Sequence, residues 1–311
     1  MIIQAIKKAE RVLIVGHQRP DGDCIGAGLA VWQICKVQNK QVDFACDSPA
    51  PAHFSFLPNY EACFTEPSGA YDLAIAVDCA DDLRLGRWIG YFQKARETIN
   101  IDHHRTNNHF ASHNFVYPQA SSTCEVLYDL LHEEGVIDAT VAYYLMMGLS
   151  TDTGHFMHAN VTPHVFKVAH ALSAFGLDIN KLADNLYKNN TPEKTKLIAR
   201  AIQSMRYFAD GKICLITVFE KDLADCGCVL ADTEGIIDYG MMIGSVEVAI
   251  CITEQKAAFK ASFRSKTIDV AAAAAVFGGG GHAKAAGCTV SGKYEDVVRK
   301  VVKSVTDGMA F

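Results

Sequence analysis

Residues 11–28, with the sequence RVLIVGHQRPDGDCIGAG, contain the stretch that decides the fold. Val12–Val15 is a continuous apolar run, which predicts a strand buried on both faces of a sheet. Ile25–Val37 then follows with helical spacing, and one histidine and two aspartates lie in the loop between them. In open α/β sheets, ligands bind beyond the carboxyl ends of the strands, so this loop is a candidate site.

Two further apolar runs repeat this arrangement. Leu73–Val77 (LAIAV) is followed by Asp78, and Thr98–Ile101 (TINI) is followed by Asp102. A helical pattern at 120–134 comes after these runs. Alternation of buried strands with helices predicts an α/β fold whose largely parallel sheet is flanked by helices.

The chain has 311 residues, which is more than one average domain. Residues 161–200 have a mostly helical pattern, and the polar stretch KNNTP at 188–192 favours a hinge there. We expect a large catalytic domain at 1–187, a hinge or linker at 188–200 and a second, smaller α/β domain at 201–311. The smaller domain is predicted to have strands at 213–218, 246–253 and 257–263, with helices near 233–242 and 295–305.

Composition and charge restrict the class of protein and its partners. Half of the residues are hydrophobic, as in ordinary globular proteins, and the net charge of -6 lacks the basic excess that holds a long duplex nucleic acid. The eleven cysteines are scattered and odd in number, which favours reduced thiols over a disulfide framework. The apolar run near the start is too short for a signal peptide or a membrane span. We therefore expect a cytoplasmic protein with no membrane partner.

The loop after the first strand carries His17, Asp21 and Asp23, in the order His-x-x-x-Asp-x-Asp. One turn can bring these side chains to a point, and such nitrogen and oxygen ligands suit Mn²⁺, Co²⁺ or Mg²⁺. For this segment alone, a polar loop with an aspartate helix cap is an equally good interpretation.

Three other segments favour the metal site. Asp78 can project from the sheet edge toward the same crevice. The sequence Asp102-His103-His104 places two imidazoles directly after a buried strand, where a merely structural loop has no need of them. Asp152 follows an apolar helical run, in a turn of small residues that permits close approach to a ligand.

The order and spacing of these segments, over the first half of the chain, resemble the DHH phosphoesterase family. Asp102-His103-His104 is the motif that names the family, and no acid or histidine of its four motifs is missing. The resemblance implies two divalent metal ions, Mn²⁺ above all, with Mg²⁺ or Co²⁺ as alternatives. The implied ligands are His17 and Asp21 for one ion, Asp23, His103 and Asp152 for the other, and Asp78 as the bridge between them.

The expected catalytic residues are His104 and Asp102. The resemblance implies that His104 faces the substrate phosphate, where it would stabilise developing charge or protonate the leaving oxygen. Asp102 is expected to support an imidazole rather than to bind a metal ion, because metal-bound histidines usually donate their other N–H to a carboxylate or a carbonyl. The nucleophile would be hydroxide from a water activated by two cations.

The second half of the chain contains a candidate substrate site. Residues 259–266 alternate, so that Lys260 and Arg264 share one strand face while the phenylalanines share the other. A solvated edge strand produces the same pattern. Four consecutive glycines then precede His282, and glycine backbone can approach a phosphate or a base closely. A flexible linker is the alternative, which the neighbouring helix and strand patterns disfavour.

This glycine-histidine segment resembles the signature of the DHHA1 domain that accompanies many DHH enzymes. The resemblance implies that Arg264, Gly280, Gly281 and His282 bind the substrate and that the two domains close over the metal ions. A DHHA1-like module also occurs in alanyl-tRNA synthetases, so by itself it indicates nucleic-acid contact rather than hydrolysis.

Within the family, the chain is most similar to the compact branch that degrades very short oligoribonucleotides and dephosphorylates phosphoadenosine phosphate. Family II pyrophosphatases have a different second domain, and the single-strand exonucleases are longer. Cyclic-dinucleotide hydrolysis and a non-catalytic nucleotide-binding module stay as alternatives. The expected partners are short RNA oligonucleotides or small nucleotides, and a homodimer is compatible with the sequence.

Overall fold

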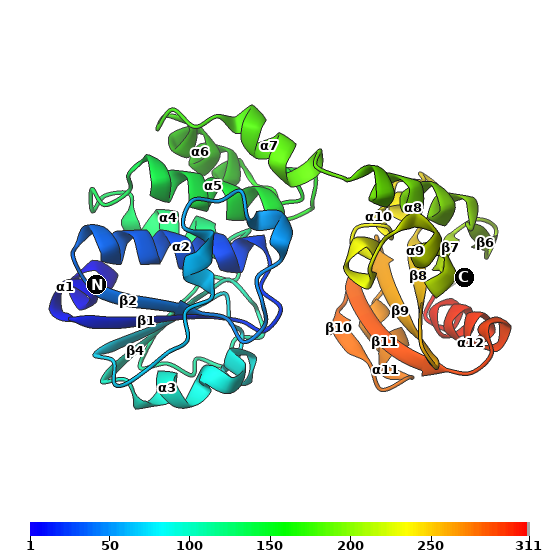
Figure 1. Cartoon of the computed structure of the whole chain (residues 1–311), viewed down its shortest axis with the longest axis horizontal. Helices are drawn as coiled ribbons and strands as arrows, with labels where there is room; N and C mark the ends of the chain where they lie inside the picture. The colour runs from blue at the N-terminus through cyan, green and yellow to red at the C-terminus, as the bar shows by residue number, and fades with distance from the viewer. Residues whose placement is uncertain (310–311) are drawn as a thin grey trace. The chain divides into compact units, whose positions relative to one another are not determined.

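The computed structural model describes residues 1–309, except for the side chain of His282. The chain divides into two compact units, with the boundary between Asn189 and Asn190 (Figure 1). Each unit has a hydrophobic core of its own. We therefore describe each unit separately.

The first unit contains a five-stranded sheet in the order β2-β1-β3-β4-β5. Every neighbouring pair is parallel, which confirms the predicted α/β class. The chain leaves β1 toward β2 on one side and returns to β3 on the other, so the strand order reverses between β1 and β3. Ligand sites of open α/β sheets lie at such a reversal. The strands are β1 Arg11–Gly16, β2 Gln41–Ala45, β3 Leu73–Val77, β4 Glu97–Asp102 and β5 His113–Val116.

Helices cover both faces of this sheet (Figure 1). On the strands, alternate side chains belong to two different clusters: Val12 and Ile14 pack with the helices on one face, and Leu13 and Val15 pack with the segment around Phe92 on the other. The helices of the first unit are α1 Ile2–Lys8, α2 Gly22–Val37, α3 Ile89–Lys94, α4 Thr123–Leu131, α5 Ala139–Asp152, α6 Pro163–Ser173 and α7 Ile179–Tyr187.

Glycines let α2 and α5 pack unusually close together. A Cβ on Gly26 would lie 2.6 Å from the Tyr144 carbonyl oxygen, and one on Gly148 would lie 3.2 Å from Cα of Asp23. Gly22, at the first position of α2, packs against Thr151 near the end of α5 in the same way. The start of α2 therefore lies beside the end of α5, and three of the predicted ligands, Asp21, Asp23 and Asp152, are found there.

The second unit contains a six-stranded mixed sheet in the order β10-β11-β9-β8-β7-β6. Its strands are β6 Arg206–Phe208, β7 Ile213–Val218, β8 Val248–Gln255, β9 Ala258–Ser265, β10 Gly280–His282 and β11 Ala285–Ser291. Its helices are α8 Pro192–Gln203, α9 Glu220–Cys226, α10 Asp238–Met241, α11 Val270–Ala275 and α12 Tyr294–Asp307. This smaller α/β unit has the class of fold that the sequence predicts.

Two segments of the second unit differ from expectation. The helix predicted near 233–242 is reduced to the four-residue α10, because Gly235 has φ +83° and interrupts the helical path. Most of the predicted linker at 188–200 lies in α8, and the buried side chains of Leu197 and Ile198 belong to a core cluster of the second unit. Hinge motion at 188–200 stays a prediction.

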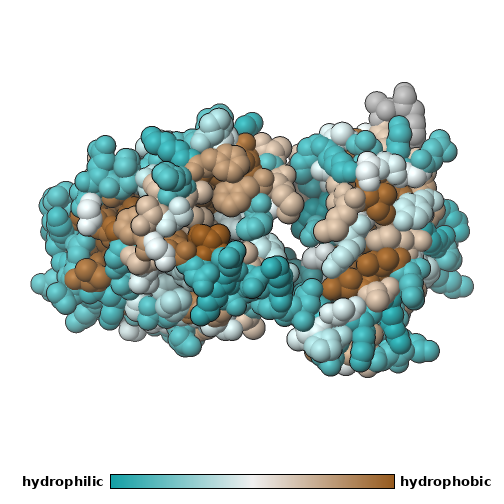
Figure 2. Space-filling model, turned by 90° about the horizontal axis from the view of Figure 1, so that it is seen from above, coloured by the Kyte–Doolittle hydropathy of each residue, from teal (hydrophilic) through white to brown (hydrophobic). Residues whose placement is uncertain are grey.

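On the face shown in Figure 2, hydrophilic residues cover most of both units and the apolar areas are smaller. None of the described helices combines the length and the apolar character that a membrane crossing requires.

Candidate metal centre

The predicted residues of the first unit meet at the carboxyl edge of its sheet. They come from the loop after β1, the start of α2, the residue after β3, the end of β4 with the two residues that follow it, and the last residue of α5. In that order they are His17, Asp21 with Asp23, Asp78, Asp102 with His103 and His104, and Asp152.

Asp78 lies at the middle of the group. Its carboxylate Oδ2 is 3.3 Å from Nε2 of His17, and its Oδ1 is 3.6 Å from Nε2 of His103. The residue is buried, its φ is +59°, and its amide donates to the Ile101 carbonyl oxygen at 2.9 Å. A left-handed backbone is costly for a residue other than glycine, so strong surrounding contacts must hold it. The two oxygens of one carboxylate thus face two separate groups.

His17 and Asp21 lie on one side of Asp78. The Nδ1–H of His17 donates to the Gln18 carbonyl oxygen at 2.7 Å, which turns Nε2 toward Asp78. Asp21 Oδ1 is 3.8 Å from Nε2 of His17. The same Oδ1 accepts the backbone N–H groups of residues 23 and 24 at 3.1 Å, so Asp21 is also the N-cap of α2. The helix-cap interpretation of this aspartate is confirmed, and its role as a metal ligand stays a prediction.

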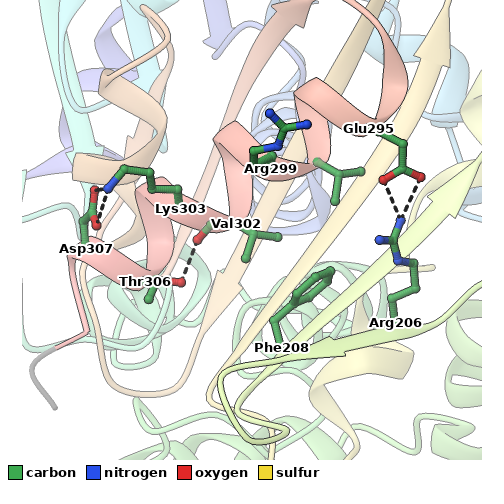
Figure 3. A pocket seen from close by; sticks show the side chains of 9 residues that line it. Arg206, Phe208, Glu295, Arg299, Val302, Lys303, Thr306 and Asp307 are labelled. Carbon is green, nitrogen blue, oxygen red and sulfur yellow. Dashed lines mark hydrogen bonds and ion pairs between the residues drawn. The ribbon is translucent and has the colours of Figure 1, made fainter.

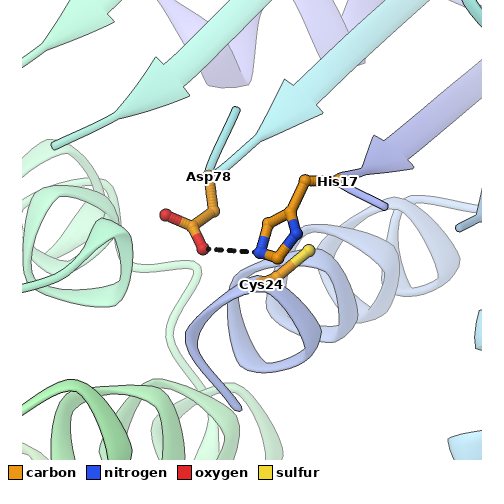
Figure 4. Close-up of side chains that lie close together, drawn as sticks. All are labelled: His17, Cys24 and Asp78. Carbon is orange, nitrogen blue, oxygen red and sulfur yellow. Dashed lines mark ion pairs between the residues drawn. The ribbon is translucent and has the colours of Figure 1, made fainter. Parts of the chain in front are cut away.

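A cysteine that the sequence analysis did not select lies beside this first group. His17, Cys24 and Asp78 each offer one possible ligand atom, and these three atoms lie within 4.8 Å of one another (Figure 4). Burial raises the pKa of the Cys24 thiol well above its usual value, and the neighbouring Cys46 adds to the effect. Cys24 is therefore a neutral thiol in this structure.

Asp23, His103 and Asp152 form the second group, also within 4.8 Å. Nε2 of His103 is 4.0 Å from Asp23 Oδ2 and 3.5 Å from Asp152 Oδ2. The Asp23 carboxylate also accepts the backbone N–H groups of Thr123 and Cys124, at 2.6 and 2.9 Å. These are the first amides of α4, and a helix N-terminus stabilises an anion. The start of α4 therefore fixes the orientation of Asp23.

Asp102 supports His104 rather than the second group. Nδ1 of His104 lies 2.7 Å from Asp102 Oδ1, and Asn107 Nδ2 donates to Asp102 Oδ2 at 2.6 Å. Asp102 has no exposed surface. A buried carboxylate held in this way fixes the orientation of the imidazole ring. Asn107 was missed by the sequence analysis, since an asparagine five residues beyond a strand has no distinctive signal.

Thr123 is a second residue that the sequence analysis missed. Its Oγ1 donates to Asp78 Oδ1 at 3.0 Å, and both residues are buried. The available signal was Ser122-x-x-Glu125, a capping pattern that predicts a helix start there. Ser122 Oγ does accept the Glu125 N–H at 3.0 Å. The pattern finds the helix but does not show that its first residue contacts Asp78.

Crowded carboxylates determine the electrostatics of the centre. Burial and the charge of Asp78 raise the pKa of Asp23 to about 7, and burial together with Asp23 raises the pKa of Asp152 to about 9. Burial opposes the charging of His103, but the surrounding carboxylates prevail and raise its pKa to about 9. Without cations, the centre must therefore hold protons at neutral pH. This excess of negative charge, with its nitrogen and oxygen donors, fits two divalent cations.

The predicted substrate residues of the second unit lie on β9 and β10. Lys260 and Arg264 are exposed on β9, while Phe259 and Phe263 are buried, as the alternation predicts. In the backbone register, Arg264 is opposite Ala285 of β11. Arg264 and Lys260 thus form the cationic face of β9.

The glycine segment forms the edge of the same sheet. Gly280 and Gly281 belong to β10, which pairs with β11, and Gly281 has φ +145°. His282 is opposite Ala285, so it lies in the same row of the sheet as Arg264. The predicted contact of the His282 side chain lies outside the described residues. The four residues therefore lie on two strands of one sheet that β11 separates, and their role in binding stays a prediction.

A cavity of about 510 Å³ in the second unit lies elsewhere, between β6 and α12 (Figure 3). Its cationic side chains are paired: Arg206 contacts Glu295 at 3.2 Å and Lys303 contacts Asp307 at 2.9 Å. It contains none of the predicted substrate residues.

Comparison with known proteins agrees with this architecture. Residues 11–149 match the DHH family, N-terminal domain, and residues 231–309 match the DHHA1 domain. The chain belongs to the DHH/DHHA1 phosphoesterase family and is a phosphoester hydrolase.

Individual relatives extend over nearly the whole chain. The chain is 30% identical over 314 residues to the bifunctional oligoribonuclease and PAP phosphatase NrnA of Thermus thermophilus, with 98% of this chain and 94% of that protein covered. The crystal structure of an exopolyphosphatase-related protein from Bacteroides fragilis has a TM-score of 0.91 at 22% identity, covering 98% and 94% of the two chains. The structure of RecJ in complex with Mn²⁺ from Thermus thermophilus has a TM-score of 0.52 at 14% identity, covering 98% of this chain and 53% of that one. The last two likenesses concern the fold.

Proposed function

We propose that this phosphoesterase hydrolyses short oligoribonucleotides, such as dinucleotides, to mononucleotides with two divalent metal ions, and that phosphoadenosine phosphate is a second substrate. The observation that carries the proposal is the Asp78 carboxylate. One of its oxygens faces His17 and the other faces His103, and further carboxylates lie around each histidine. This is the arrangement that a ligand bridging two ions requires.

The proposed ligands follow the two groups around Asp78. His17 and Asp21 would bind one ion, and Asp23, His103 and Asp152 would bind the other. Two divalent ions, Mn²⁺ being the one we expect, supply an activated water and neutralise phosphate oxygens when bound. The backbone amides at the start of α4 hold Asp23 in place, which preserves the geometry of the second group.

His104 is the proposed catalytic residue that faces the phosphate. The buried Asp102 contacts its Nδ1 at 2.7 Å, so the ring is held in one orientation. A histidine held in this way is suited to stabilise charge on a phosphate oxygen or to protonate the leaving oxygen. Asp102 acts through His104 and is a positioning residue.

Two features support a short substrate. The net charge of -6 disfavours a long polyanion, and the cationic side chains Lys260 and Arg264 form a small exposed area on β9. The glycine backbone of β10 lies at the edge of the same sheet and offers close approach to a phosphate or a base. The activities named for the Thermus thermophilus relative are consistent with this substrate class.

The test is hydrolysis of a 5′-labelled RNA dinucleotide, phosphoadenosine phosphate, cyclic di-AMP and pyrophosphate, each with Mn²⁺, Mg²⁺ or chelator. We expect metal-dependent release of mononucleotides from the dinucleotide, with slower or absent cleavage of the cyclic substrate and of pyrophosphate. Preferred cleavage of cyclic di-AMP would replace this proposal with the cyclic-dinucleotide alternative. No cleavage of any substrate would favour a non-catalytic nucleotide-binding module.

A further inference from the structure

A separate cluster of metal-ligating side chains lies on α4 and α6, outside the centre described above. Glu125 and Asp129 are on α4, and His164 is near the start of α6. One possible ligand atom from each residue lies within 4.8 Å of the other two. Nε2 of His164 is 2.9 Å from both Asp129 oxygens and 3.9 Å from Glu125 Oε1.

Among the described residues, hydrogen bonds are donated to only one of the two oxygens of the Glu125 carboxylate. The residue is 4% exposed, and its Oε2 accepts the Ser121 N–H at 2.7 Å and the Ser121 hydroxyl at 2.5 Å. In the described part of the chain, Oε1 accepts no hydrogen bond, and Nε2 of His164 lies 3.9 Å from it. Burying a carboxylate is costly unless a cation or a hydrogen bond compensates each oxygen. A cation beside Oε1 would supply this compensation.

The geometry suits one ion. Glu125 and Asp129 are four residues apart on a helix and therefore point from the same face. Ligand atoms about 2.1 Å from a tetrahedral ion lie about 3.4 Å apart, and the observed 2.9 and 3.9 Å bracket that separation. The three side chains line a cavity of about 370 Å³, which has room for a water molecule as a further ligand.

We propose that Glu125, Asp129 and His164 bind one divalent transition-metal ion, Zn²⁺ or Mn²⁺, at a site separate from the candidate metal centre. One imidazole and two carboxylates are ligands that both ions accept. The ion would cross-link α4 to α6. Glu125 contacts Ser121, two residues before Thr123, so the ion would also stabilise the segment that contacts Asp23 and Asp78.

The test counts bound ions in matched histidine variants. Metal-free full-length protein is dialysed against Zn²⁺ or against Mn²⁺, and the metal content of each chain is measured by mass spectrometry. His164→Ala removes the proposed ligand. His113→Ala is the control, because His113 is a similarly exposed histidine that contacts a single carboxylate, Glu97, at 3.4 Å. We expect His164→Ala to bind one ion fewer per chain than the wild type and His113→Ala to bind the same number.

Asp129→Asn provides a second variant that should fold, because Asp129 is exposed. It should also lose one ion per chain. Equal metal content in wild type, His164→Ala and Asp129→Asn would overturn the proposal.

A variant of the candidate metal centre separates this proposal from the proposed function. In an Asp78→Asn background, Zn²⁺ should raise the thermal midpoint of the His113→Ala protein more than that of the His164→Ala protein. This comparison does not depend on activity or on occupancy of the centre around Asp78. An equal rise in both proteins would contradict the separate site.

Discussion

In the first unit the predicted functional side chains converge and are largely buried, whereas in the second they lie along an exposed strand. Asp78 and Asp23 are almost fully buried, and hydrogen bonds from Thr123 hold both carboxylates. Arg264 on β9 is exposed, and its guanidinium donates to the carbonyl oxygen of its own neighbour, Phe263, at 3.1 Å. One region is rigidly organised before any ligand binds, and the other can adapt.

This difference has an energetic consequence. Gathering several carboxylates out of water is unfavourable without cations, so the two proposed ions would stabilise the first region as well as serve its chemistry. An exposed arginine has no such cost, and its contact with a phosphate is screened by water and salt. Substitutions in the first region should therefore have large effects on catalysis, and those in the second should have moderate effects on substrate binding.

The largest effect is expected from Asp78→Asn. The amide keeps the shape of the side chain but removes the charge that both groups share, so kcat/KM for the dinucleotide should fall by roughly a thousandfold. Metal content should fall in the same protein. Asp82→Asn, a partly exposed carboxylate outside the cluster, is the control and should keep full activity. If Asp78→Asn kept its activity, Asp78 would not bridge two ions. The first region would then be no more sensitive to substitution than the second.

Thr123→Val tests whether the support of Asp78 matters. The substitution keeps the volume but removes the hydroxyl that donates to Asp78 Oδ1. Loss of such a contact to a metal-binding carboxylate should reduce metal affinity or kcat by about 10- to 100-fold. Titration calorimetry with Mn²⁺ and steady-state kinetics measure the two quantities. Thr123→Ser keeps the hydroxyl and should recover most of the loss, whereas an equal defect in both variants would point to packing.

The strand ends that carry the candidate centre could be predicted from sequence because two signals coincide there. Apolar runs such as Leu73–Val77 identify buried parallel strands, and the polar residue that ends each run must lie at the carboxyl edge of the sheet. The apolar helical run before Asp152 could also be recognised in the sequence. The prediction that these residues lie close together depended on the fold class and on the family resemblance. Sequence spacing alone would not have given it.

The supporting contacts could not be predicted in this way. Thr123 contacts Asp78 across 45 positions of sequence, and the contact depends on how α4 approaches the sheet. The close packing of α2 on α5 could not be predicted either, because nothing in the sequence indicates which residues Gly26 and Gly148 contact. The length of α10 was mispredicted because a helical apolar pattern outweighed the effect of Gly235. Long-range packing, rather than local preference, decides these features.

Arg264→Ala should affect substrate binding more than chemistry. Loss of one exposed charge-assisted contact to phosphate should raise KM for the dinucleotide by about tenfold and leave kcat within about twofold. Arg299→Ala is the matched control, since Arg299 is an exposed arginine on α12 that pairs with Asp296 and is not among the predicted substrate residues, and its loss should change neither constant. A large fall in kcat with unchanged KM would mean that Arg264 acts in the transition state, and the second region would then resemble the first.

The last effect concerns stability rather than activity, in the pH dependence of the metal-free protein. Folding raises the pKa of Asp23 from 3.8 to about 7, that of Asp152 from 3.8 to about 9 and that of His103 from 6.5 to about 9. Between these unfolded and folded values, the folded chain binds more protons than the unfolded chain. Its stability should therefore fall as pH rises through this window. The pKa of Asp78 is lowered, so its contribution to stability is constant above its ordinary value of 3.8 and is lost only as pH falls below that value.

Thermal unfolding in chelator at pH 6 and pH 9 measures this fall. Mn²⁺ should reduce it, because bound cations replace the protons that the carboxylates otherwise hold. Asp152→Asn should flatten the pH dependence of the metal-free protein, since the amide has no proton to lose in this range. If the metal-free protein were equally stable at both pH values, the carboxylates would have to be hydrated rather than crowded in a dry site. The first region would then carry no electrostatic cost from its crowded carboxylates, and it would not differ from the exposed second region in this respect.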